Sequence, residues 1–146
     1  MKVLLIDDHP LFQAALSSVI QGLGDNVEVI TCSSAGEARQ KLEEDPEYDL
    51  ALLDLQLGDA NGFDLLSDMR ARYPSLPAVV ISASDRTSDV IRAIDMGAMG
   101  FVPKRASNET LIEALRLVMS GGIYVPQMSL GGEPSPAREG DTVPAV

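Results

Sequence analysis

Tyr48-Asp49-Leu50-Ala51-Leu52-Leu53-Asp54-Leu55-Gln56-Leu57 is an almost unbroken apolar run with an acid near its end. Such a run is typical of a strand that is buried on both faces of a parallel sheet. In open α/β sheets the chemistry collects outside the carboxyl ends of the strands. Asp54 is therefore a candidate site residue on its position alone.

The bulk composition limits the class of protein. A chain of 146 residues is one domain's worth, and its formal net charge of −11 argues against a nucleic-acid-binding surface of its own. No apolar run approaches the roughly 20 residues that cross a bilayer, and no signal pattern opens the chain, so we expect a cytoplasmic protein. Cys32 is the only cysteine and lies in an apolar stretch, which favours a small buried hydrophobe over a reactive thiol.

Apolar runs and helical periodicities alternate along the chain. Four further strands are predicted, over Lys2–Ile6, Val27–Thr31, Ala78–Ser82 and the very short Met99–Val102. One helix is predicted after each strand, five in all. Strands that alternate with helices predict a parallel sheet covered on both faces. The signals for the helices are Pro10 at the first start, a capping box at Ser34–Glu37, caps at Asn61 and Ser107, and an inner face of Val90, Ile91 and Ile94 that ends at Gly97.

The pattern collapses near Gly121. The segment from Gly131 to Val146 consists of Gly, Pro, Ser and charged residues without an apolar period, which predicts a flexible linker or tail. We therefore expect one folded domain over residues 1–122 and a linker over residues 123–146.

Three acids follow predicted neighbouring strands, and we expect Asp7, Asp8 and Asp54 to meet at one edge of the sheet. Carboxylates that share a site repel one another unless they protonate or bind a hard cation, and oxygen ligands alone favour Mg²⁺ over zinc. Ser82 and Lys104 are expected at the same rim. A hydroxyl and a compact cation beside a carboxylate and Mg²⁺ suit a transferring phosphoryl group, with Asp54 as the nucleophile.

These residues also carry a family resemblance. The chain resembles the receiver domain of a bacterial two-component response regulator of the NarL/FixJ or LuxR-type subfamily, over roughly residues 1 to 125. Five pieces in the family's order and spacing make the resemblance specific. The pieces are Val3-Leu4-Leu5-Ile6-Asp7-Asp8-His9-Pro10-Leu11-Phe12, Leu52-Leu53-Asp54-Leu55, Gly62 with Asp64-Leu65-Leu66, Val80-Ile81-Ser82-Ala83, and Gly97-Ala98-Met99-Gly100-Phe101-Val102-Pro103-Lys104.

The resemblance implies an α/β, flavodoxin-like (βα)5 fold, a doubly wound parallel sheet with strand order 2-1-3-4-5. It also implies a role for each site residue. Asp54 would be the phosphoacceptor, and Asp8, Asp54 and the backbone carbonyl of Gln56 would hold Mg²⁺, with Asp7 contributing directly or through water. Lys104 and Ser82 would stabilise the phosphoryl group, Phe101 would be the switch aromatic, and Gln56 and Ser84 would tune the phosphoryl lifetime.

The implied function is a phosphorylation-activated switch that catalyses only its own phosphoryl transfer and dephosphorylation. Its partners would be a sensor histidine kinase, a second copy on activation, and DNA through a C-terminal helix-turn-helix domain that is absent from this chain. The alternative is a stand-alone receiver that acts through protein–protein contacts. Two other functions fit the residues less well. A phosphatase of the haloacid-dehalogenase type would need a second acid where Gln56 stands. A flavodoxin-like flavin-binding protein would bind the flavin phosphate after its first strand, where Asp7-Asp8 would repel it.

Four positions modify these expectations. Gly58 stands where the family usually has proline, so a looser loop is expected there. Arg105 replaces a common proline, so the peptide before it need not be cis. Phe101 cannot hydrogen-bond outward as a tyrosine can, which favours its inward state. His9 is interpreted as a partly exposed residue of the cap region and not as a ligand or phosphodonor.

Overall fold

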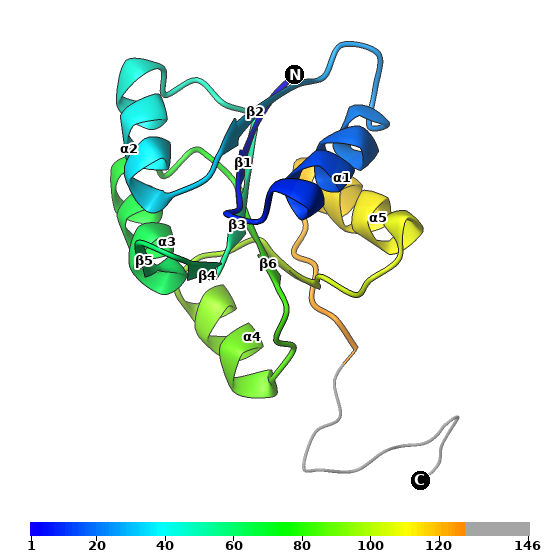
Figure 1. Cartoon of the computed structure of the whole chain (residues 1–146). Helices are drawn as coiled ribbons and strands as arrows, with labels where there is room; N and C mark the ends of the chain where they lie inside the picture. The colour runs from blue at the N-terminus through cyan, green and yellow to red at the C-terminus, as the bar shows by residue number, and fades with distance from the viewer. Residues whose placement is uncertain (128–146) are drawn as a thin grey trace, which may run out of the picture.

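The computed structural model describes residues 1–127, and a five-stranded parallel sheet with the order β2-β1-β3-β6-β7 runs through its centre (Figure 1). A separate hairpin of β4 and β5 follows β3, so β6 and β7 are the fourth and fifth strands of the main sheet. The predicted order 2-1-3-4-5 is therefore confirmed. The strands are β1 (Lys2–Ile6), β2 (Glu28–Cys32), β3 (Leu50–Asp54), β4 (Gln56–Leu57), β5 (Ala60–Asn61), β6 (Ala78–Ser82) and β7 (Gly100–Pro103).

Helices cover both faces of the sheet. Figure 1 shows α1 and α5 on one face and α2, α3 and α4 on the other, and a separate group of buried apolar side chains fills each side. Every residue of β3 is buried, as the opening stretch predicted. The helices are α1 (Pro10–Gln21), α2 (Ala35–Glu44), α3 (Gly62–Arg72), α4 (Thr87–Asp95) and α5 (Asn108–Met119).

Local chemistry starts three of these helices where the sequence predicted. Ser34, Asn61 and Ser107 are the N-caps of α2, α3 and α5, and each side chain accepts a backbone N–H from the first turn. The predicted capping box is changed in one detail. Glu37 reaches back to the N–H of Ser33, at 2.7 Å, and not to that of Ser34.

Several predicted boundaries and one predicted face were wrong. The second strand begins and ends one residue later than expected, because its pairing with β1 runs from Lys2–Glu28 to Ile6–Cys32. The last strand is likewise shifted, to Gly100–Pro103. On α4, Ile91 is 50% exposed while Ala93 is buried with Val90, because residues three apart share a helix face and the next residue turns away from it.

The chain beyond α5 returns to the sheet. After Gly121, which has a φ of 98°, Tyr124 forms a parallel bridge to Gly100. The Tyr124 N–H donates to the Met99 carbonyl at 3.0 Å, and the Phe101 N–H donates to the Tyr124 carbonyl at 3.1 Å. The predicted linker lies mostly outside the described residues, so the boundary at residue 122 stays a prediction. Within residues 1–127 no helix has the length and apolarity that crossing a membrane requires.

Candidate functional site

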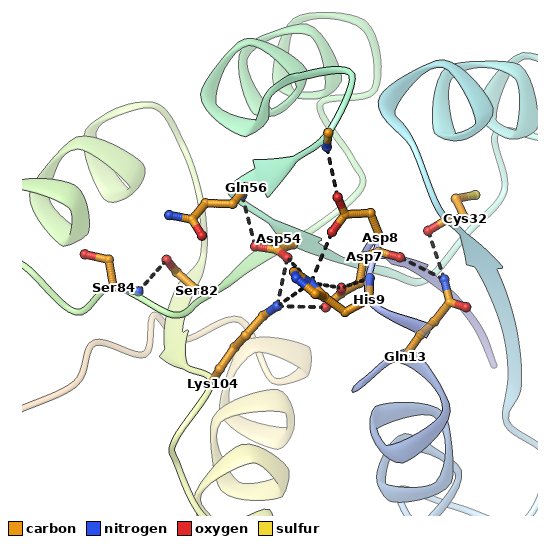
Figure 2. Close-up of polar contacts among 11 residues, drawn as sticks. Asp7, Asp8, His9, Gln13, Cys32, Asp54, Gln56, Ser82, Ser84 and Lys104 are labelled. Carbon is orange, nitrogen blue, oxygen red and sulfur yellow. Dashed lines mark hydrogen bonds and ion pairs between the residues drawn. The ribbon is translucent and has the colours of Figure 1, made fainter. Parts of the chain in front are cut away.

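Three carboxylates gather at the carboxyl edge of the sheet, as predicted. Asp54 is the last residue of β3, while Asp7 and Asp8 directly follow β1, which pairs with β3. Asp7 and Asp54 are buried, whereas the Asp8 side chain is 28% exposed. Figure 2 shows the three side chains converging on the same space.

Lys104 joins this group from the position directly after β7, the strand at the edge of the sheet. Its Nζ donates to Asp54 Oδ2 at 2.9 Å and lies 3.3 Å from Asp7 Oδ2. The backbone N–H of Lys104 donates to the Ser82 carbonyl at 2.7 Å, which fixes the chain just past β7. One lysine against three buried or partly buried carboxylates leaves an excess of negative charge in a shared site.

Each carboxylate also accepts one backbone N–H. Gln56 donates to Asp54 Oδ1 at 3.0 Å, Gly58 donates to Asp8 Oδ2 at 3.0 Å, and His9 donates to Asp7 Oδ1 at 2.8 Å. These bonds fix the carboxylates and leave two buried oxygens, Asp7 Oδ2 and Asp8 Oδ1, that accept no hydrogen bond. Lys104 Nζ lies 3.3 Å from Asp7 Oδ2, and His9 Nδ1 lies 3.1 Å from Asp8 Oδ1. Buried polar atoms are normally hydrogen-bonded, so both oxygens are suited to take a further ligand.

The free oxygens fit a divalent cation. One atom from each of Asp7, Asp8, His9 and Asp54 falls within a group whose members all lie within 4.8 Å of one another. Carboxylate oxygens with an open side toward solvent suit Mg²⁺, which keeps several waters and binds through few carboxylates. The acidic cluster could therefore hold a metal ion.

His9 lies closer to the cluster than the sequence suggested. It is the N-cap residue of α1, but its side chain makes no cap hydrogen bond. Its Nδ1 lies 3.1 Å from Asp8 Oδ1 and 3.2 Å from Asp7 Oδ1, while the side chain remains 60% exposed. The expectation of a partly exposed residue was correct, and its contact with the carboxylates was missed.

Ser82 and Ser84 shape the opposite side of the site. Ser82 is buried at the end of β6, and its Oγ accepts the Ser84 N–H at 3.1 Å. The Ser84 hydroxyl donates to Asp89 Oδ2 at 2.9 Å, which ties the loop to the first turn of α4. Figure 2 shows the bond between Ser82 and Ser84. Phe101 on β7 is fully buried, so its ring occupies the inward position. The structure thus brings Lys104 onto Asp54 and leaves Ser82 bonded to its own loop.

The loop after the central strand is held by several hydrogen bonds, while the looser loop expected from Gly58 stays a prediction. Its residues form the β4–β5 hairpin, and the Gly58 N–H donates to Asp8. At the tip, the Asp59 carboxylate accepts the N–H groups of Ala35 and Gly36 at the start of α2, at 3.0 and 3.2 Å. These N–H groups hold the pKa of Asp59 below its usual value.

One supporting residue was missed altogether. Gln13 on α1 donates through Nε2 to the carbonyls of Asp7 and Cys32, at 3.0 and 3.1 Å, and so braces the ends of β1 and β2. Its only sequence signal is a polar residue on the first helix.

Cys32 itself is buried, and burial raises the pKa of its thiol to about 12, which agrees with the predicted inert role. All peptide bonds within residues 1–127 are trans, including the one before Arg105.

Comparison with known proteins agrees with this geometry. The profile of a family described as the response regulator receiver domain matches residues 3–116. The chain is 32% identical over 125 residues to a glycerol metabolism activator from Pseudomonas putida, covering 86% of this chain and 57% of that protein. It is 34% identical over 119 residues to the nitrate/nitrite response regulator protein NarL of Escherichia coli K12, covering 82% and 55%. The chain thus spans little more than half of these relatives.

A solved structure shows the same likeness in three dimensions. A LuxR family DNA-binding response regulator from Silicibacter pomeroyi superposes with a TM-score of 0.78 at 31% identity, covering 87% of this chain and 98% of that one. The matched range, residues 3–116, contains the three carboxylates and Lys104. This chain belongs to the response regulator receiver domain family of two-component signalling proteins.

Proposed function

We propose that Asp54 accepts a phosphoryl group and that the chain is the phosphorylation switch of a two-component system. The observation that carries this proposal is the pairing of a buried strand-end carboxylate with Lys104 at 2.9 Å, beside two buried carboxylate oxygens that accept no hydrogen bond. Carboxylates form acyl phosphates as covalent intermediates, and preorganised charges stabilise the transferring group.

Asp7, Asp8 and Asp54, with the backbone carbonyl of Gln56, would hold Mg²⁺. When bound, the ion would neutralise charge on the oxygens of the incoming phosphoryl group. A carboxylate oxygen of Asp54 attacks the phosphorus of a phosphohistidine, the P–N bond breaks, and the imidazole leaves with the electron pair and takes a proton from water. Lys104 already contacts Asp54 Oδ2, so its ammonium stays beside the new acyl phosphate.

Reversal of the switch is hydrolysis. Water attacks the phosphorus, the bond to the Asp54 oxygen breaks, and inorganic phosphate leaves the free carboxylate. We propose that Gln56, whose side chain is exposed beside the site, and Ser84 tune how easily this water arrives. The phosphoryl transfer to Asp54 and the hydrolysis of the acyl phosphate are the only reactions that we assign to the domain. The proposal places both in the cytoplasm.

The output of the switch is proposed from Ser82, Phe101 and their elements. After phosphorylation, the Ser82 hydroxyl would leave the Ser84 N–H and donate to a phosphoryl oxygen. The loop into α4 would then move, and Phe101 on the neighbouring strand would hold the new arrangement. The affected surface is that of α4, β7 and α5.

The wider protein is also a proposal, since the chain spans 57% of the P. putida relative. A sensor histidine kinase would be the phosphodonor, and phosphorylation would favour a homodimer. Relatives named as DNA-binding response regulators favour a C-terminal DNA-binding domain joined through residues 123–146 over a stand-alone receiver.

The test is intact-mass spectrometry after incubation with acetyl phosphate and Mg²⁺. We expect a single added phosphoryl group that is lost in Asp54→Asn and with a chelator. Asp64→Asn is the matched control, because Asp64 is an exposed acid on the first turn of α3. An adduct that survives Asp54→Asn, or one that forms equally well in chelator, would contradict the assignment of the acceptor or of the metal.

A further inference from the structure

Gly58 supplies the site with a backbone N–H, which a proline at this position would lack. Its backbone N–H donates to Asp8 Oδ2 at 3.0 Å, across 50 positions of sequence. Proline has no N–H, so the usual family residue at this position would leave this oxygen without its donor. We propose that Gly58 is a positioning residue whose N–H holds Asp8 for Mg²⁺ binding, an inference that rests on the magnesium site proposed above.

Asp8 is the carboxylate that needs such a support. Asp7 and Asp54 are enclosed by the ends of their strands, whereas the Asp8 side chain is 28% exposed. With Oδ2 held by Gly58, the other oxygen, Oδ1, is buried and accepts no hydrogen bond, although His9 Nδ1 lies 3.1 Å from it. The N–H therefore orients Asp8 so that Oδ1 is left for the cation, and an ordered ligand loses less rotational freedom when it binds.

The donor is itself held on both sides. The hairpin pairs Leu57 with Ala60, and the N–H of Gly62 donates to the Leu55 carbonyl at 3.0 Å. Next to Gly58, the Asp59 carboxylate accepts two N–H groups from the start of α2. Contacts with α2 and within the hairpin therefore place Gly58, and its N–H holds this position before any phosphoryl group is attached.

Two substitutions at the same position separate the N–H from everything else. A Cβ at Gly58 would meet only Asp8 Oδ2, at 3.4 Å, so Gly58→Ala is accommodated and keeps the N–H. Gly58→Pro removes it, and Leu57 in β4 has the extended backbone that proline requires of the residue before it. Outer-shell partners of metal ligands typically change affinity by about tenfold or more.

The experiment measures Mg²⁺ binding by isothermal titration calorimetry without any phosphodonor. We expect Gly58→Pro to bind Mg²⁺ about tenfold more weakly than wild type, and Gly58→Ala to stay within about twofold. Urea unfolding of both variants in chelator measures their stability. A purely structural role would lower Mg²⁺ affinity and stability together, so an affinity gap between variants of equal stability supports the positioning role.

A wild-type measurement keeps the test decisive if the proline variant fails to fold. Amide hydrogen exchange should show the Gly58 N–H protected relative to the exposed Gly24, with the protection lost in Asp8→Ala. Equal Mg²⁺ affinity in the three proteins, or a Gly58 amide that exchanges as fast as that of Gly24, would overturn the positioning role alone. A wild-type protein that binds no Mg²⁺ would overturn the magnesium site together with this inference.

Discussion

Gly62, the first residue of α3, is expected to tolerate no side chain. A Cβ built there would lie 2.7 Å from the Leu55 carbonyl oxygen and 2.8 Å from that of Asp54, and closer still to the Leu55 Cα. Ordinary contacts need roughly 3.5 Å or more. All three neighbours are backbone atoms at the end of the central strand, so none can swing aside as a side chain would.

The cost of Gly62→Ala follows from that geometry. Overpacking against a rigid neighbour costs about 1–3 kcal/mol. Moving α3 away also weakens the Gly62 N–H bond to the Leu55 carbonyl, 3.0 Å long, which contributes about 1 kcal/mol. Alanine's better helix propensity returns up to about 1 kcal/mol. We expect a net loss of about 2 kcal/mol, or roughly 8 °C in Tm for a domain of this size.

Urea unfolding followed by circular dichroism measures this loss. Gly24→Ala is the matched control, because its Cβ would meet only Val27 Cγ2 at 3.8 Å and should change the free energy of unfolding by less than about 0.5 kcal/mol. Since the strain falls on Asp54 and Leu55, Gly62→Ala should also bind Mg²⁺ more weakly. A Gly62→Ala protein as stable as Gly24→Ala would refute the reasoning, because it would mean that the backbone there yields freely.

Three further predictions concern a loop, a thiol and a cap. Because N–H groups of α2 lower the pKa of Asp59, its contribution to stability is present above the unfolded pKa of 3.8 and is lost as pH falls through the folded pKa. Asp59→Asn should therefore lose more stability at pH 6 than at pH 3, and equal losses in urea titrations at the two pH values would argue against it. The Cys32 thiol, with a pKa raised to about 12, should react with a disulfide reagent at pH 8 only after unfolding, so fast labelling of native protein would contradict its burial. Ser107→Ala should lower the free energy of unfolding by about 1 kcal/mol, because Ser107 Oγ accepts the Thr110 N–H. Ser67→Ala, at an exposed serine, is the control and should leave it unchanged. Equal effects of the two substitutions in thermal melts would be inconsistent with the cap.

The sheet and its site could be predicted because both depend on local patterns. An apolar run such as the one that ends at Asp54 identifies a buried strand, and parallel strands bring their carboxyl ends to one edge. Caps at Ser34, Asn61 and Ser107 are equally local, since each side chain bonds to its own helix. For the same reason the order of residues along the chain was enough to place the acids and Lys104 together.

Features that depend on backbone donors or on distant contacts were missed. The N–H of Gly58 carries no side-chain signature, and its partner Asp8 lies 50 positions away. Gln13 bonds to two carbonyls from different strands, and nothing in its own neighbourhood reveals them. Ile91 was assigned to the inner face of α4 because it is apolar, but the position of the helix on the sheet decided otherwise.

The bridge between Gly100 and Tyr124 bears on how the domain can be shortened for experiments. The residues after α5 pair with the Phe101 N–H on β7 and with the carbonyl of Met99, directly before β7, which would otherwise be unpaired at the edge of the sheet. Open margins of this kind recruit strands from other molecules. A truncation at residue 122 would create a surface prone to aggregation, and it would do so beside Phe101. Fusions and truncated proteins should therefore keep the chain at least through Val125.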